Sequence, residues 1–90
     1  MTKFIDGSFC ISIAGHDKNT IYVVVGNDGN VLLCDGKFKK LGNPKRKNEK
    51  HLKLLDYADA DLNNLMAINK LHDENIKYSI KKYLIHIGGK

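Results

Sequence analysis

Hydrophobic and polar positions alternate along the first half of the chain, which predicts short β-strands. In residues 9–14, Phe9, Ile11 and Ile13 fall on one face of an extended segment, and smaller residues fall on the other. Ile21–Val25 is a run of β-branched and aromatic residues, which is typical of a strand covered on both faces. Two strands are therefore expected before residue 26.

Turn-forming residues separate the strands that follow. Residues 26–30 predict a tight turn, because Gly and Asn readily adopt the positive φ that hairpins require. Val31–Cys34 predicts a third strand, and Asp35-Gly36 predicts a second turn. Phe38 lies between two lysines, which predicts a short fourth strand with the ring inward and the cations outward.

A last strand is expected over His51–Leu55, with Leu52 and Leu54 facing the interior. Short strands joined by tight turns over residues 8–55 predict a small five-stranded β-barrel, an architecture with few exposed edges.

After Leu55 the hydrophobic period changes to that of a helix. The first helix is expected to have its N-cap at Asp59, with Asp61 near the positive end of the helix dipole, and to end at Leu71 or His72. Its apolar residues recur at helical spacing, at Leu62, Leu65, Met66 and Ile68.

A second helix is expected to begin near Asp73 and Glu74, and Gly88-Gly89 stands close to the last residue, Lys90. Its apolar stripe consists of Ile76, Ile80, Tyr83 and Leu84. The predicted fold is therefore α+β. The chain is expected to form a single domain over residues 1–90, with the barrel at 8–55 and a C-terminal extension of one or two helices at 56–90.

Composition places the chain among ordinary globular proteins. It has 90 residues, of which 42% are hydrophobic and 28% are charged. No apolar run approaches the roughly 20 residues needed to cross a bilayer, and residues 1–6 lack the apolar core of a signal peptide. A cytoplasmic protein without a membrane partner, monomeric when free, is the expectation.

The cysteines and histidines do not predict a metal site. Cys10 and Cys34 both lie in apolar, strand-like runs, where a reduced thiol behaves as a small hydrophobic group. Zinc sites use ligands paired at short spacing, whereas the histidines are scattered at His16, His51, His72 and His86. We therefore expect reduced cysteines, no metal and no cofactor.

The net charge of +5 is unevenly distributed along the chain. Residues 35–55 carry eight basic side chains against Asp35 and Glu49, which gives this segment a charge of +6. Residues 1–34 sum to −1, residues 56–76 to −4 and residues 77–90 to +4. A basic block within a folded domain favours a polyanionic partner, although many proteins carry a solvated lysine-rich surface.

The centre of the basic block is expected to project as a loop. Pro44 has a fixed φ and pushes Asn43 into an extended conformation. Lys45, Arg46 and Lys47 then present three cations, one of them a guanidinium suited to bidentate phosphate contact. Because the barrel's few aromatic residues are expected in the core, the predicted recognition is of backbone and shape rather than of sequence.

Residues 10–25 resemble the KOW motif, a strand–loop–strand unit with a central glycine, a lysine and then alternating apolar residues. Gly15 matches the glycine and Lys18 matches the loop cation. Asn19 stands where family members usually have a second glycine, and Asn also tolerates left-handed geometry.

The segments 35–41, 43–47 and 50–52 resemble the part that follows the KOW unit in bacterial KOW-domain RNA-binding proteins, which are similar to the large-subunit ribosomal protein family L-fourteen-e. The resemblance covers about residues 9–55 and implies an SH3-like barrel, an RNA partner, ribosome association and no catalysis. With the basic block, it gives these candidate RNA-binding residues: Gly15, Lys18, Asn19, Lys37, Lys39, Lys40, Asn43, Lys45, Arg46, Lys47, Lys50 and His51.

An enzyme and a protein-interaction module are the two alternatives to RNA binding. The sequence contains no nucleophile elbow, P-loop or zinc-protease helix, so a catalytic site is not expected. A protein-interaction module is the main alternative, because SH3-like barrels also bind proteins and KOW units occur in transcription elongation factors. In that case the acidic segment from Asp56 to His72 would dock a ribosomal or transcription protein.

Overall fold

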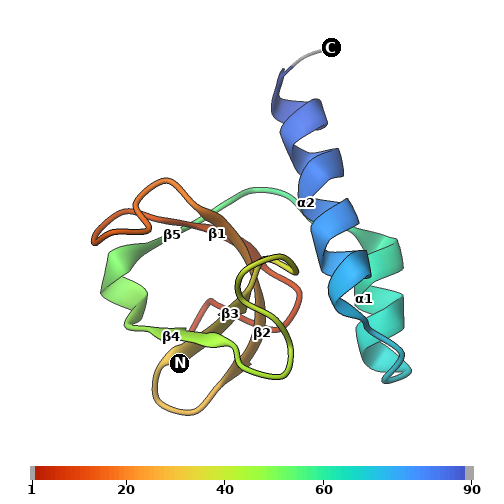
Figure 1. Cartoon of the computed structure of the whole chain (residues 1–90), viewed down its shortest axis with the longest axis horizontal. Coiled ribbons are helices and arrows are strands. Elements are labelled where there is room, and N and C mark those ends of the chain that lie inside the picture. The colour runs from red at the N-terminus through yellow and green to blue at the C-terminus, as the bar shows by residue number, and fades with distance from the viewer. Residues whose placement is uncertain (1, 89–90) are drawn as a thin grey trace.

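A single antiparallel sheet and two helices make up the computed structural model, which describes residues 2–88. The strands are β1 (Phe9–Ser12), β2 (Ile21–Asn27), β3 (Val31–Cys34), β4 (Lys45–Lys47) and β5 (Leu52–Leu54), in the spatial order β4-β3-β2-β1-β5. The helices α1 (Ala60–Ala67) and α2 (Asp73–Gly88) follow and pack beside the sheet (Figure 1). The predicted α+β class is confirmed.

The two edge strands, β4 and β5, are neighbours in sequence although they lie at opposite ends of the strand order. Asn48 and the single 3-10 turn η1 (Glu49–His51) join them, and the sheet curls so that both edges lie on the same side (Figure 1). In the part of the chain that the structure describes, β4 and β5 are not hydrogen-bonded to each other. The sheet is therefore curled but open, and the predicted five-stranded barrel is not closed.

Both faces of the central strands are buried, as Ile21–Val25 predicted. Tyr22 and Val24 belong to a cluster inside the curled sheet, which also contains Leu52 with Leu54 packed against it. Val23 belongs to a second cluster between the sheet and the helices. The remaining buried members are Phe4, Cys10, Val31 and Leu33 in the first cluster and Phe9, Cys34, Leu62, Ile76 and Tyr83 in the second. The alternation of side chains thus supplies two cores.

The first strand is shorter than predicted. It ends at Ser12, whose hydroxyl lies 3.0 Å from the carbonyl oxygen of Ala14 and 2.9 Å from Oδ1 of Asp17, so that its one proton is shared within the following loop and favours a turn over further extension. Ile13, expected on the same strand face as Phe9 and Ile11, lies beyond the strand and is 46% exposed.

The predicted strand around Phe38 is wrong. Oδ1 of Asp35 accepts hydrogen bonds from the backbone N–H groups of the three residues from Lys37 to Lys39, at 2.8–2.9 Å. These bonds hold a tight loop in which the Phe38 ring points outward and is 78% exposed. The local Asx-turn chemistry of Asp35 has overridden the strand propensity of the aromatic residue.

The prediction of a projecting basic loop is also wrong. Lys45–Lys47 forms β4 and pairs with β3, so that Arg46 faces Leu32 across the ladder. Pairing with the sheet satisfies the backbone groups that a loop would leave to water. An extended conformation was expected next to Pro44, but the residues that follow it form strand β4 rather than a loop.

The first helix begins where predicted and ends earlier. Asp59 is its N-cap, with a side chain that accepts hydrogen bonds from the N–H groups of Asp61 and Leu62. The helix ends at Ala67 because Asn69 adopts a left-handed φ of 58° and the N–H of Lys70 donates back to the Leu65 carbonyl at 2.8 Å. This is a Schellman ending, and it removes residues 68–72 from the expected helix.

The second helix begins at Asp73, as predicted. Oδ1 of Asn75 accepts a hydrogen bond from the backbone N–H of His72, which stabilises the first turn. Ile76 and Tyr83 are buried, but Leu84, expected in the same stripe, is 49% exposed. Gly89 lies outside the described residues. Within residues 2–88, neither helix combines the length and the apolar character that crossing a membrane would require.

Candidate nucleic-acid interface

The loop between β1 and β2, residues 13–20, has the backbone geometry that the sequence suggested. Gly15 and Asn19 adopt φ values of 86° and 76°. The N–H of Asn19 donates to the Ser12 carbonyl at 2.7 Å, and the N–H of Lys18 donates to the Gly15 carbonyl at 3.2 Å. The loop is therefore closed on itself, with the Lys18 side chain exposed.

Asp17 ties this loop to β4. Its Oδ1 accepts hydrogen bonds from Nζ of Lys47 at 2.7 Å and from Oγ of Ser12 at 2.9 Å. Its Oδ2 accepts one from the Tyr22 hydroxyl at 2.8 Å and lies 3.8 Å from Nζ of Lys45. The Asp17 carboxylate therefore has four side-chain partners from β1, β2 and β4.

These contacts favour the ionised form of Asp17. Burial alone would raise the pKa of its carboxyl, but the hydrogen bonds from Lys47 and from the two hydroxyl groups, together with the charge of Lys45, hold that pKa well below its usual range. Burial and the adjacent carboxylate raise the pKa of Tyr22, so its hydroxyl stays protonated as a donor. The network is therefore a stable, ionised structural unit.

The lysines of β4 contact the Asp17 network and are only partly exposed to solvent. Lys47 also donates to the Ala14 carbonyl at 2.9 Å, and its side chain is only 11% exposed. Lys45 is 32% exposed. Arg46 is 67% exposed but forms a 2.6 Å ion pair with Asp28 from the β2–β3 turn. Lys47 is thus a positioning residue, whereas Lys45 and Arg46 remain accessible to a partner.

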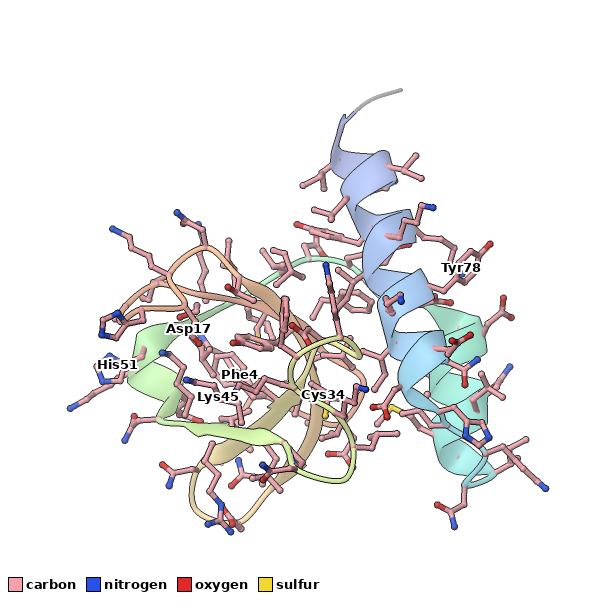
Figure 2. The ribbon with its side chains drawn as sticks, viewed as in Figure 1. Phe4, Asp17, Cys34, Lys45, His51 and Tyr78 are labelled. Atoms are coloured by element: carbon pink, nitrogen blue, oxygen red, sulfur yellow. The ribbon has the colours of Figure 1, made fainter. Side chains whose placement is uncertain are left out.

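The 3-10 turn η1 lies next to the same loop. The backbone N–H of Ile13 donates to the carbonyl of His51 at 2.9 Å, and the side chain of Asn48 accepts from the N–H of Lys50. Figure 2 shows Asp17, Lys45 and His51 at the end of the sheet that faces away from the helices. We call this the basic end, defined by Lys18, Lys45, Lys47, Lys50 and His51. Arg46 lies on the opposite face of β4, towards Asp28.

The other candidate residues lie elsewhere. Lys37, Lys39, Lys40 and Asn43 belong to the β3–β4 loop, which packs against the start of α2 (Figure 1). A Cβ on Gly36, whose φ is 78°, would collide with backbone atoms of that helix.

The N–H of Leu41 also anchors the β3–β4 loop, by donating to Oδ1 of Asp73 at 2.8 Å. The predicted site is therefore divided between the basic end and a second surface beside α2.

That second surface includes two lysines that sequence reasoning missed. Lys77 and Lys81 of α2 line a groove of about 390 Å³ together with Lys37. The remaining lining residues are Asn19, Thr20, Ile21, Asp35, Ile80 and Leu84. The sequence signal was the i, i+4 spacing of the two helix lysines in a segment of net charge +4.

The two cysteines present no exposed thiol for metal or nucleophilic chemistry. Cys10 and Cys34 are free and fully buried, and burial raises the pKa of each thiol to about 12. Among residues 2–88, no three His, Cys, Asp or Glu side chains are grouped so that they could hold a metal ion.

The acidic segment before and within α1 also has an internal role. Asp59 is 7% exposed, and its Oδ2 accepts a hydrogen bond from Ser79 at 2.6 Å and lies 2.9 Å from Nζ of Lys82. Although burial opposes ionisation, these two contacts from α2 lower the pKa of Asp59. Asp59 therefore joins the helices, and Asp56 and Asp61 are the exposed carboxylates of this segment.

Comparison with known proteins found no family model that matches the chain and no curated protein that matches it significantly.

Proposed function

We propose that this chain is a non-catalytic RNA-binding protein of the cytoplasm that associates with the ribosome and contacts RNA phosphates through its basic end. The observation that carries the proposal is the convergence of cations from three separate segments, the β1–β2 loop, β4 and η1, on one end of the sheet. Lys18 is exposed in the β1–β2 loop and Lys50 in η1, and Lys45 of β4 is partly accessible.

The fold supports an SH3-like, KOW-type domain as the scaffold. The strand order places β4 and β5 at opposite edges of the sheet, while one 3-10 turn connects them directly. Such a connection requires the sheet to curl until its edges approach, as in a small, partly open barrel. Gly15 and Asn19 both have positive φ, as the resemblance to the KOW loop leads one to expect.

Phosphate contact by the basic end can be tested through the salt dependence of RNA binding. Each phosphate contact on a single strand adds about 0.7 to the slope of log affinity against log salt, and about 0.9 on a duplex. Lys18 and Lys50 are the variants of choice, because both are exposed. We expect K18A/K50A to weaken binding of an rRNA hairpin and to flatten this slope by about 1.8.

A matched control separates local contact from net charge. Lys70 is exposed in the α1–α2 connection, and K70E lowers the net charge by the same two units as K18A/K50A. K70E should leave the slope almost unchanged. Equal slopes for wild type and K18A/K50A, with both folded by circular dichroism, would exclude the basic end as the phosphate-binding surface.

A further inference from the structure

The groove beside α2 has an apolar floor and a cationic rim. Ile21, Ile80 and Leu84 supply apolar surface between the sheet and the helix. Lys37 reaches its edge from the β3–β4 loop, and Lys77 and Lys81 reach it from α2. Its volume of about 390 Å³ falls within the range of small-molecule sites, about 300–1,000 Å³.

The charge of the groove favours an anionic occupant. Among the described residues that line it, Asp35 is the one carboxylate against three lysines. Oδ1 of Asp35 already accepts three backbone N–H groups of its own loop. The lysines, by contrast, are exposed and have no carboxylate within ion-pair distance in the part of the chain that the structure describes.

An exposed aromatic ring neighbours Lys37, one of the lysines that line the groove. Phe38 is 78% exposed, and Nζ of Lys37, a lining residue, lies 5.1 Å from the centre of its ring. Contact of a base with this ring would remove apolar surface of both from water, which is favourable. Nucleobases stack on such rings whatever their sequence, because every base has a π face.

We infer that this groove binds an unpaired nucleotide of single-stranded RNA. The base lies against the apolar floor or the Phe38 ring, and the flanking phosphates contact Lys37, Lys77 and Lys81. The inference rests on the proposed RNA binding and extends it to a second surface. Asn19, at the end of the β1–β2 loop, lines the groove, so an RNA strand leaving the basic end could continue into it.

An acidic peptide with apolar side chains is the alternative occupant. Its carboxylates would pair with the lysines and its apolar side chains would cover the floor of the groove. Neither contact explains an exposed flat ring beside a cation. The combination of an exposed ring and three lysines without carboxylate partners fits a nucleotide better.

The test compares two RNA probes, a single-stranded 12-nucleotide oligouridylate and a hairpin whose stem is fully paired and whose loop is as short as the RNA chain allows. K77A/K81A should fold, because both residues are exposed, Ala favours helices, and Ala keeps the Cβ of Lys77 that packs near Gly36. It should flatten the salt slope for oligouridylate by about 1.4, more than the charge-matched K70E does, and leave the hairpin slope unchanged.

A second variant isolates stacking. F38A should weaken oligouridylate binding about tenfold without changing its salt slope, because a base stack is lost and no charge is. On addition of oligouridylate, the backbone amide resonances of residues 37–39 and 77–84 should shift in the wild type.

The outcomes separate this inference from the proposed function. If K77A/K81A and F38A bind oligouridylate like K70E while K18A/K50A still weakens hairpin binding, the groove inference fails and the basic end stands. If hairpin binding is also unaffected by K18A/K50A, the proposed function fails as well. Groove resonances that shift with a 12-residue peptide of alternating Glu and Leu, and not with oligouridylate, would assign the groove to a protein and overturn the inference.

Discussion

Lys47 and Asp17 lie 30 residues apart and form a 2.7 Å ion pair that joins β4 to the β1–β2 loop. Their side chains are only 11% and 15% exposed. A largely buried pair of this kind is costly to break, because the remaining charge loses its partner without regaining full hydration. The pair therefore fixes the loop that presents Lys18.

We predict that K47A lowers the free energy of unfolding by about 2 kcal/mol, since the Asp17 carboxylate and the Ala14 carbonyl both lose a donor. R46A, which removes an exposed ion pair from the same strand, should cost less than about 0.5 kcal/mol. Urea denaturation of both variants checks this. Equal losses of unfolding free energy for K47A and R46A would show that the Lys47–Asp17 pair stabilises the fold no more than an exposed ion pair does.

The same network predicts a specific dependence of stability on pH. The folded pKa of Asp17 lies below the unfolded value of about 3.9. Its stabilisation is therefore complete above that value and is lost as the pH falls towards the folded pKa. Between pH 5 and pH 3, urea denaturation should show a steeper loss of stability for the wild type than for D17N. An equal loss of stability in the wild type and in D17N would contradict the lowered pKa of the Asp17 carboxyl.

Gly36 should be the least replaceable glycine of the β3–β4 loop. G36A combines a left-handed φ with a collision against the α2 backbone, and we expect a cost of at least about 2 kcal/mol. For a domain of this size that corresponds to a fall in Tm of roughly 10 °C. Gly42 is the control, because a Cβ there meets nothing within 4 Å, so G42A should change Tm little. A similar Tm for both would mean that the loop is not held against α2.

Local signals in the sequence predicted local structure well. The β-branched run at Ile21–Val25 predicted a strand covered on both faces, and Asp59 predicted a helix N-cap; both are confirmed. The positive φ of Gly15 and Asn19 also follows from residue type. In each case a few neighbouring residues determine the conformation.

Features that depend on distant partners were missed. The strand β4 was missed because its pairing with β3 decided its conformation. Phe38 was missed for a local reason, since the turn chemistry of Asp35 overrode its strand propensity. Lys47 was expected to contact phosphate, and nothing near it in the sequence indicates that it meets Asp17. The groove lysines Lys77 and Lys81 acquire a common surface with Lys37 only once α2 has packed beside β2.

Ribosome association distinguishes RNA contact from docking to a protein. If the basic end contacts rRNA, K18A/K50A should leave the ribosomal fractions of a sucrose gradient at a lower salt concentration than the wild type, because fewer counterion-releasing contacts hold it.

A docking module would instead depend on the acidic segment. Its test is D56N/D61N, which spares Asp59 because that residue joins the two helices and its loss would destabilise the fold. We expect D56N/D61N to sediment like the wild type, or to stay bound at slightly higher salt, since it removes negative charge. Release of D56N/D61N together with retention of K18A/K50A would replace the RNA-binding proposal with the docking alternative.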